Sequence, residues 1–369
     1  MRNRGLDILR AVAVLLVLGR HGGGPRVWNN VGWIGVDLFF VLSGFLISGL
    51  LYSEYKKTGG INWKRFFIRR GFKIYPAFYA MIFITPLWSI VSHHQIRWRA
   101  MLPEVLFYQS YQPNRVWAHT WSLAVEEHFY ILLPALLLTM LYFQKKNGRD
   151  PFRMVPLVCA GLGALCLLGR AYLAYTSPRV GDWWQYIQFP THLRIDSLFF
   201  GVFLGYLYHF HAERLRSFRA GRWPSLFLAA CSTLLISSCF VFSVDSPFML
   251  SFGLTALYLG FGGILLLVVC GGSEADTEGK LRRKSWLGSA LAYIGMYSYS
   301  IYLWHPMVSQ HVRDLEMRIW PGIPDFAVFW SYALSSLIVG ILLSRLIEYP
   351  ALRLRDRLFP SIQQPVKGS

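Results

Sequence analysis

Residues 6–21 read LDILRAVAVLLVLGRH and form the first hydrophobic stretch of the chain. Arg10 and His21 are eleven positions apart in it. On an α-helix, eleven steps of about 100° return to within about 20° of the starting direction, and they rise about 16 Å. Both side chains are therefore expected on one helix face at two depths. Ionisable groups inside a membrane helix are costly, so this pair predicts a functional site.

The composition is typical of an integral membrane protein. Of the 369 residues, 54% are hydrophobic and 15% are charged, and the mean hydropathy is +0.37. Because a span takes about 20 residues, about ten helices and their connections would use the whole chain. Residues 1–369 are therefore predicted to form a single transmembrane domain without an appended soluble domain.

Apolar runs bounded by charged residues, Gly or Pro predict an all-α bundle. The ten expected membrane helices cover residues 6–21, 31–52, 74–92, 121–143, 154–175, 193–211, 225–243, 248–271, 286–308 and 326–348. The first is too short to cross a hydrocarbon core of about 30 Å. The sequence Gly22-Gly23-Gly24-Pro25 is expected to end this helix directly after His21, beside a cavity.

The first helix is expected to be retained rather than cleaved as a signal peptide, because Arg10 and Arg20 interrupt or bound its apolar run. With a cytoplasmic N-terminus, the inner segments hold 25 Lys and Arg residues and the outer loops hold seven. This asymmetry follows the positive-inside rule and predicts that both termini are cytoplasmic. The net charge of +18 is then explained by topology and membrane lipids, and nucleic-acid binding is not expected.

The five cysteines lie in apolar segments, and we expect core residues rather than disulfides or metal ligands. They are Cys159, Cys166, Cys231, Cys239 and Cys270. No metal site is predicted.

A cluster of ionisable residues opens the fourth expected helix. Residues 117–130 read WAHTWSLAVEEHFY, with the carboxylates of Glu126 and Glu127 followed by His128. Neighbouring carboxylates cannot both ionise freely in a low dielectric. One of these two carboxylates is expected to share a proton, pair with an arginine or orient an imidazole. The alternative is a polar helix start that suits the helix dipole.

The inner segment at residues 62–76 reads NWKRFFIRRGFKIYP and mixes cations with aromatics. One interpretation is an amphipathic helix that anchors the loop at the membrane interface. The other is a cradle for a polyphosphate, with Arg69, Arg70 and Lys73 clustered within one turn.

Other polar residues fall in apolar segments: Asp7, Asp37, Arg170, Arg194, Asp196, His305, Arg345 and Glu348. Arg194 and Asp196 are two positions apart and point in different directions on a helix, so each needs a partner elsewhere. Tyr297, Tyr299, Ser300, Tyr302 and His305 are interpreted either as a polar lining or as an aromatic interface belt.

An ordered set of motifs spans nearly the whole chain and resembles the membrane-bound acyltransferase family 3 of bacterial glycan modification. The motifs are GLDILRA at 5–11 with the Arg10 to His21 spacing, GVDLFFVLSGFLI at 35–47, Arg69-Arg70 with Ile74-Tyr75-Pro76, Trp121-Ser122-Leu123 with Glu126 and Phe129-Tyr130, SYSIYLWHP at 298–306, and Glu348-Tyr349-Pro350.

The resemblance implies a ten-helix bundle in the bacterial cytoplasmic membrane. It would move an acyl group, usually acetyl from cytoplasmic acetyl-CoA, to a hydroxyl of an extracytoplasmic or lipid-linked glycan. It implies that Arg10 and His21 are the central catalytic pair and that Glu126, rather than Glu127, is the regular carboxylate. Arg69, Arg70, Lys73 and Tyr75 would bind the donor. Supporting roles would fall to Asp7, Asp37, Ser43, Trp121, Ser122, Glu127, Tyr130, Tyr302 and His305.

Two positions depart from the family pattern. Lys73 stands where a third arginine is frequent, which keeps the charge but loses the bidentate fork, and His128 stands where Gln is common. Some members carry an esterase-like extracellular domain, which is not expected here, so transfer would end in the bundle or involve a separate partner.

The resemblance, carried onto these residues, implies a mechanism. The CoA phosphates would dock on the cations of residues 69–73, and the pantetheine arm would reach toward Arg10. His21, oriented by Glu126, would deprotonate the acceptor hydroxyl, while Arg10 or a Tyr or Ser hydroxyl stabilises the oxyanion. Direct transfer and a covalent acyl-His intermediate are both compatible with the sequence.

Two rival functions stay open: a transporter or flippase of an envelope glycan precursor, and a non-catalytic assembly subunit. Acceptor contacts are expected in the outer loops at 92–120 and 176–192. The acyl chain, the acceptor and the oligomeric state are not encoded in a readable motif.

Overall fold

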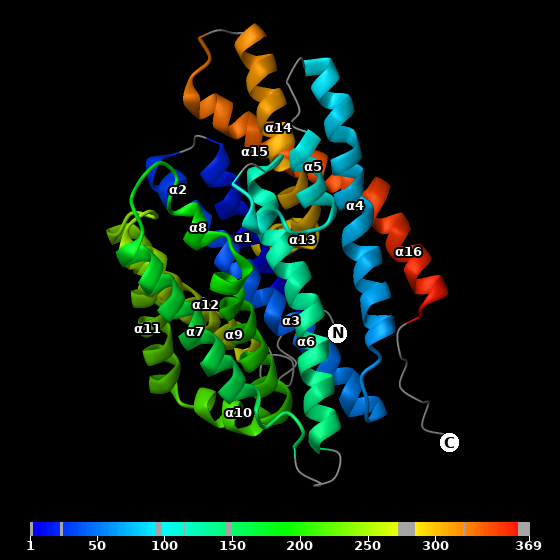
Figure 1. Cartoon of the computed structure of the whole chain (residues 1–369), viewed down its shortest axis with the longest axis vertical. Coiled ribbons are helices and arrows are strands. Elements are labelled where there is room, and N and C mark those ends of the chain that lie inside the picture. The colour runs from blue at the N-terminus through cyan, green and yellow to red at the C-terminus, as the bar shows by residue number, and fades with distance from the viewer. Residues whose placement is uncertain are drawn as a thin grey trace.

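The computed structural model describes residues 3–22, 25–92, 98–113, 115–144, 150–271, 285–319 and 322–360. Helices form the regular structure of this part of the chain. The all-α prediction is confirmed, with no strand among these residues. In chain order (Figure 1) the elements are α1 Arg4–His21, α2 Arg26–Val31, η1 Gly32–Ile34, α3 Gly35–Thr58, α4 Trp63–Ser92, α5 Trp98–Val105, η2 Gln109–Tyr111, η3 Ala118–Thr120, α6 Trp121–Gln144, α7 Val155–Thr176, α8 Gln185–Gln188, α9 Thr191–Phe210, α10 Ala212–Ala220, α11 Arg222–Val241, η4 Met249–Gly253, α12 Leu254–Gly271, α13 Trp286–Met296, α14 Ser298–Ile319, α15 Asp325–Leu343, η5 Ser344–Glu348 and α16 Tyr349–Leu358.

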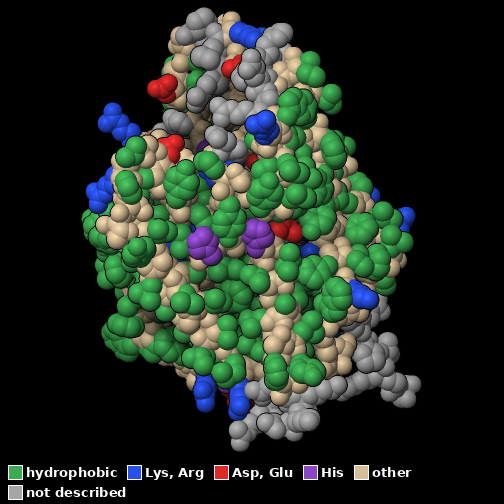
Figure 2. Space-filling view, viewed as in Figure 1, with side chains coloured by type: hydrophobic (Ala, Val, Ile, Leu, Met, Phe, Trp, Pro, Cys, Tyr) green, Lys and Arg blue, Asp and Glu red, His purple; other side chains and the backbone are tan. Residues whose placement is uncertain are grey.

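Six helical stretches of the described residues are long and apolar enough to cross a membrane, which makes the chain a multi-pass membrane protein. They are Arg26–Thr58, Ala118–Phe143, Val155–Thr176, Arg222–Val241, Met249–Gly271 and Asp325–Leu358. Apolar side chains also cover most of the face seen in Figure 2. The count of about ten spans and the cytoplasmic position of both termini stay predictions.

Helix α1 packs against α3, α12, α13 and α14 in the middle of the bundle. It begins where the Asn3 side chain accepts a hydrogen bond from the Gly5 N–H at 2.9 Å. It ends at His21, as predicted, with Gly22 as its C-cap. A Cβ atom at Gly295 of α13 would lie 1.8 Å from the Asp7 carbonyl oxygen. The absence of a side chain at Gly295 therefore lets α13 approach α1 closely.

Helices α3 and α9 cross at two glycines. A Cβ atom at Gly44 would lie 1.9 Å from the Leu198 carbonyl oxygen, and one at Gly201 would lie 2.3 Å from that of Val41. Backbone-to-backbone contact of this kind requires residues without side chains on both helices.

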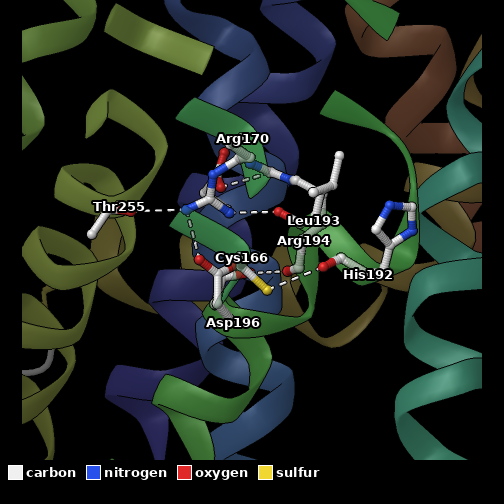
Figure 3. A network of polar contacts seen from close by, with 9 residues as sticks. Cys166, Arg170, His192, Leu193, Arg194, Asp196 and Thr255 are labelled. Atoms are coloured by element: carbon white, nitrogen blue, oxygen red, sulfur yellow. Dashed lines mark hydrogen bonds and ion pairs between the residues drawn. The ribbon is translucent and has the colours of Figure 1, made fainter. Parts of the chain in front are cut away.

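Two charged pairs are buried between these helices and α7. The Arg194 guanidinium on α9 donates to Asp37 of α3 at 2.7 Å, and that of Arg170 on α7 donates to Asp196 of α9 at 2.8 Å. Figure 3 shows that Arg170 also donates to Thr255 of α12. The prediction that Arg194 and Asp196 have separate partners is confirmed. Asp37 forms a structural ion pair that joins α3 to α9.

The expected interfacial segment at residues 62–76 is part of one continuous helix with the apolar segment after it. The Asn62 side chain caps α4 by accepting from the Arg65 N–H at 3.0 Å. Helix α4 therefore begins at Trp63, eleven positions before the predicted start at residue 74. The basic residues project from the same rigid element that continues toward α5.

The expected helix at residues 286–308 is divided in two. Helix α13 ends at Met296, where Tyr297 leaves the helical conformation with φ −100° and ψ 5°, and α14 then runs to Ile319. Helix α3 also differs from the expected 31–52, because α2 and η1 precede it and Gly59, with φ 73°, ends it after Thr58. Hydropathy alone does not mark the break at Tyr297, since apolar residues such as Ile294, Met296 and Ile301 surround it.

Candidate active site

Three cavities follow one another through the bundle, and shared residues connect them. The first is the basic cleft, lined by Leu50, Leu51, Ser53, Glu54, Lys57, Arg65, Phe66, Arg69, Arg70, Lys73, Leu352 and Arg355. Arg70 and Lys73 also line the second, the Arg10 cavity. Val36 and Tyr302 line both the Arg10 cavity and the third, the His21 cavity. Arg10 and His21 thus lie on one helix but line neighbouring cavities.

The basic cleft has a volume of about 470 Å³. It collects cations from α3, α4 and α16, and Glu54 is the acidic residue of its lining. The guanidinium of Arg69 donates to Asp356 at 3.1 Å and also to the Phe359 carbonyl oxygen. Arg69 therefore ties α4 to α16 at the wall of the cleft.

Lys73 has a carboxylate partner of its own. Its ammonium forms an ion pair with Glu348 of η5, and the other oxygen of Glu348 accepts from Ser300 at 2.8 Å and from Ser344 at 3.1 Å. The charge of Lys73 is thus largely balanced by the protein. Arg70 has no ion-pair partner among the described residues, and its guanidinium lies 5.8 Å from the Tyr130 ring centroid.

The Arg10 cavity has a volume of about 210 Å³ and a mixed lining. The guanidinium of Arg10 forms an ion pair with Asp7 at 3.1 Å. On α6, the Tyr130 hydroxyl donates to Glu126 at 3.0 Å, and Ser43 lies 3.2 Å from the same hydroxyl. Phe39, Phe40, Leu42, Leu46, Ile47 and Ile74 make much of the remaining wall apolar. A slender chain with a polar end is the kind of ligand that such a lining accepts.

Tyr302 separates the Arg10 cavity from the His21 cavity. Its hydroxyl donates to the His119 carbonyl oxygen at 2.8 Å and shares a hydrogen bond of 2.6 Å with the Ser122 hydroxyl. These bonds hold α14 against the start of α6. A small hydroxyl network therefore stands at the junction of the two cavities.

The His21 cavity, about 290 Å³, is where three histidines gather. The ring centroids of His21 and His305 are 5.1 Å apart, and those of His305 and His119 are also 5.1 Å apart. His21 and His119 line the cavity, and His305 is fully buried behind them. No group of three or more His, Cys, Asp or Glu in the described residues has the geometry of a metal site.

Backbone carbonyls set the protonation of two of these rings. His305 Nδ1 lies 2.6 Å from the Tyr302 carbonyl oxygen, whose helical donor would be the missing N–H of Pro306. His119 Nε2 lies 3.1 Å from the Leu303 carbonyl oxygen. Because a carbonyl only accepts, each of these nitrogens carries the hydrogen. His305 Nε2 and His119 Nδ1 are left as buried acceptors without a described partner.

The expected contact between Glu126 and His21 is not found among the described residues. Glu126 lines the Arg10 cavity with Arg10, whereas His21 lines the neighbouring cavity. Tyr130 is the hydrogen-bond donor to Glu126, and histidines are the neighbours of His21. Val36 and Tyr302, which line both cavities, lie between the two residues.

Two further expected site residues form a pair outside the three cavities. The Tyr75 hydroxyl donates to Glu127 at 3.1 Å, and neither residue is in the linings. Tyr75 therefore contacts α6 rather than the basic cleft. Trp121 lines the His21 cavity, with its ring perpendicular to that of Phe40.

Sequence reasoning did not select His119, Arg20 or Arg115 as site residues. All three line the His21 cavity. His119 stands in the quoted segment 117–130, so the signal was present. Its importance depends on contact with His305, far away in the sequence. Arg115 lies on the loop after η2 and has no periodic pattern to mark it.

Comparison with known proteins identifies the class to which this arrangement belongs. Residues 3–345 match the family described as an acyltransferase domain, and the chain belongs to this acyltransferase family 3. No solved structure matches it.

Curated relatives cover nearly all of this chain. It is 29% identical over 372 residues to the peptidoglycan O-acetyltransferase OatA of Listeria monocytogenes. The match covers 94% of this chain and 55% of that protein. It is also 29% identical over 389 residues to YrhL of Bacillus subtilis, to which peptidoglycan O-acetyltransferase activity is provisionally assigned. That match covers 98% of this chain and 56% of that protein. The chain thus spans about half the length of these relatives.

Proposed function

We propose that this chain is a membrane O-acetyltransferase that moves an acetyl group from cytoplasmic acetyl-CoA to a hydroxyl of an extracytoplasmic or lipid-linked glycan, in the cytoplasmic membrane of a bacterium. The observation that carries the proposal is the series of three cavities joined by Arg70 and Lys73 and then by Val36 and Tyr302. Such a series would let a donor and an acceptor enter from opposite ends and meet. The names of the relatives support acetyl as the group transferred and a glycan as the acceptor.

The basic cleft suits the phosphates of the donor. Lys57, Arg65 and Arg69 line it, and Arg70 stands where the cleft joins the Arg10 cavity. Arginine binds phosphate through a planar, bidentate fork, and an arginine without a carboxylate partner is free to do so. Lys73, balanced by Glu348, would steer the donor less strongly than Arg70. The pantetheine arm would then lie along the apolar wall of the Arg10 cavity.

The reaction would occur beside Tyr302. His21 takes the proton of the acceptor hydroxyl, the hydroxyl oxygen attacks the thioester carbonyl carbon, and the oxyanion is stabilised by Arg10 or by the hydroxyls of Ser122 and Tyr302. The carbon–sulfur bond then breaks, and the CoA thiolate takes the proton back from His21. The products are an acetyl ester and free CoA.

The acceptor nitrogens of His305 and His119 would support His21 in place of a carboxylate. An imidazole that has taken a proton needs a hydrogen-bond acceptor for its second N–H. Both nitrogens are buried and without a described partner. The His305 ring lies beside that of His21, and His119 contacts His305 and lines the same cavity as His21. They are the positioning groups of this proposal.

The test is acetyl transfer by the purified full chain in lipid nanodiscs, with radiolabelled acetyl-CoA and isolated envelope glycan. We expect labelled ester with the unchanged chain and a loss of at least about a hundredfold with His21→Ala. His209→Ala is the matched control, because this histidine lies on α9 outside the three linings. Full transfer by the His21 variant would overturn the proposal.

The same reaction separates the rival functions and the two chemical routes. Translocation of a glycan precursor without ester formation would indicate a transporter, and a phenotype that survives the double variant Arg10→Ala, His21→Ala would indicate an assembly subunit. Label that stays on the denatured chain when acceptor is omitted would indicate an acyl-His intermediate. Free CoA formed only with acceptor present would indicate direct transfer.

A further inference from the structure

The His21 cavity has an unusual charge balance for a sugar-binding site. Its lining includes two arginines and two histidines, Arg20, His21, Arg115 and His119, and no described Asp or Glu. The lining also has aromatic and amide side chains, Trp33, Trp121, Trp184, Phe189, Tyr302, Gln185 and Gln188, and the aliphatic residues Val17, Val36, Pro113, Ala118 and Val244. A ligand of this cavity would therefore meet positive charge that no lining carboxylate balances.

No carboxylate among the described residues balances the positive charge of Arg20. One guanidinium nitrogen donates to the Asn29 carbonyl oxygen at 3.0 Å, and no described carboxylate forms an ion pair with it. The contrast with Arg10 on the same helix is clear, because Arg10 is paired with Asp7. The buried arginines Arg170 and Arg194 are likewise paired with Asp196 and Asp37.

Arg115 is held rigidly across the cavity and is also without an ion pair in the described part of the chain. Its guanidinium donates to the Gln112 carbonyl oxygen at 2.6 Å and to the Gln185 side chain at 2.9 Å, and lies 4.2 Å from the Phe189 ring centroid. Its Nε is buried and has no hydrogen-bond partner among the described residues. Arg115 thus presents an oriented guanidinium to the cavity without a described carboxylate partner.

The Glu104 carboxylate acts on Arg115 electrostatically but does not form an ion pair with it. Burial lowers the pKa of Arg115 to about 10, although the Glu104 carboxylate acts in the opposite direction. Glu104 itself faces Thr120 and the Trp117 N–H rather than Arg115. Burial also raises the pKa of Glu104 to about 7, which reduces its charge near neutral pH.

We infer that the His21 cavity takes a saccharide that carries an anionic group, a carboxylate or a phosphate, and that Arg20 and Arg115 recognise this group. The inference rests on the proposed function, in which this cavity receives the acceptor. The tryptophan rings offer apolar surface to a sugar ring, while the arginines supply fork-shaped donors to the anion. A volume of about 290 Å³ suits one or two sugar rings rather than a longer chain.

The experiment measures binding without any acyl donor. Three probes are titrated against the purified full chain in micelles by NMR: methyl β-glucoside as the neutral sugar, methyl β-glucuronide as the carboxylate and glucose 1-phosphate as the phosphate. We expect one of the two anionic sugars to bind at least about tenfold more tightly than the glucoside, with a preference that falls as salt is raised. Which of the two binds better decides the source of the anion.

Two variants connect the preference to the residues. Arg115→Gln and Arg20→Gln should each reduce it by at least about threefold, while the affinity for the neutral glucoside stays within about twofold. Arg20→Gln keeps the test decisive if the loop around residue 115 does not tolerate substitution. Arg179→Gln is the matched control, because this arginine faces Trp183 outside the three linings. Equal affinity for all three probes, or a preference that survives both variants, would overturn the inference.

This outcome is separable from that of the proposed function. Acetyl transfer that proceeds normally in a chain with no anionic preference would contradict only the inference about the saccharide. Anion-selective sugar binding in a chain that never transfers acetyl groups would contradict only the proposed reaction.

Discussion

The imidazole ring of His305 lies 5.1 Å from that of His21, measured between their centroids. His305 comes from α14 and His21 from the end of α1. Because Pro306 leaves the Tyr302 carbonyl without its helical donor, His305 Nδ1–H takes that place, and its Nε2 is held as an acceptor. The proline thus explains why a neutral imidazole with a defined tautomer stands behind His21.

Replacement of this imidazole should slow transfer without weakening donor binding. His305→Asn keeps an N–H that can reach the Tyr302 carbonyl but removes the imidazole acceptor, and we expect kcat to fall by about 10- to 100-fold. The KM for acetyl-CoA should stay within about twofold. Steady-state transfer kinetics measure both. A matching rise in KM with unchanged kcat would argue that His305 shapes donor binding instead. His209→Asn serves as the control.

Loss of the unpaired cation at the mouth of the Arg10 cavity should weaken donor binding. For Arg70→Gln we expect the Kd for CoA to rise by about tenfold or more, because a charge-assisted contact with phosphate is lost. Calorimetric titration at two salt concentrations should also show a smaller salt dependence in the variant. Lys64→Gln is the comparison, since Lys64 lies on the same helix outside the cleft lining. Equal CoA affinity in the two variants would remove Arg70 from the donor site.

The buried pair between α3 and α9 should matter for stability rather than for chemistry. Asp37→Ala leaves Arg194, which is 2% exposed, without its partner. We expect a loss of about 3–5 kcal/mol in the free energy of unfolding, measured by denaturation in micelles. The double variant Asp37→Ala, Arg194→Leu should recover much of it, since no uncompensated charge remains. Asp182→Ala, an exposed site, should change little.

The pH dependence of stability should carry a contribution from Glu104. Its pKa is raised to about 7 by burial, so the folded chain binds the proton more tightly than the unfolded chain. The contribution is fully present below the ordinary carboxyl pKa and is lost as the pH rises through about 7, at up to about 1.4 kcal/mol per pH unit.

Glu104→Gln should remove this slope, because the amide does not titrate and its oxygen can still accept from Thr120. Chemical denaturation at pH values from 5 to 8 compares the two chains. Parallel stability curves for variant and unchanged chain would contradict the role given to Glu104.

Several features of this protein follow from local sequence alone. Residues 6–21 contain the periodic pattern that places Arg10 and His21 on one helix, and that helix ends at His21 as expected, with Gly22 as its C-cap; Gly23 and Gly24 lie outside the described residues. The two-residue spacing of Arg194 and Asp196 requires separate partners, which the fold supplies. Hydrophobic periodicity, charge and helix-breaking residues act over a few turns, so one sequence is enough to read them.

The candidate site itself was decided by the tertiary structure. Which residues meet His21 depends on how distant segments pack: α14 places His305 beside it, and His119 of η3 lines the same cavity, whereas Glu126 lines the Arg10 cavity. Likewise, Lys73 resembles a free donor-binding cation in the sequence, but η5 places Glu348 against it. A side chain's chemical character belongs to its residue type, whereas its partners are set by contacts between segments far apart in the chain. Only the packed bundle therefore distinguishes the cations that are already paired from Arg20, Arg70 and Arg115, which face the cavities without a described carboxylate partner.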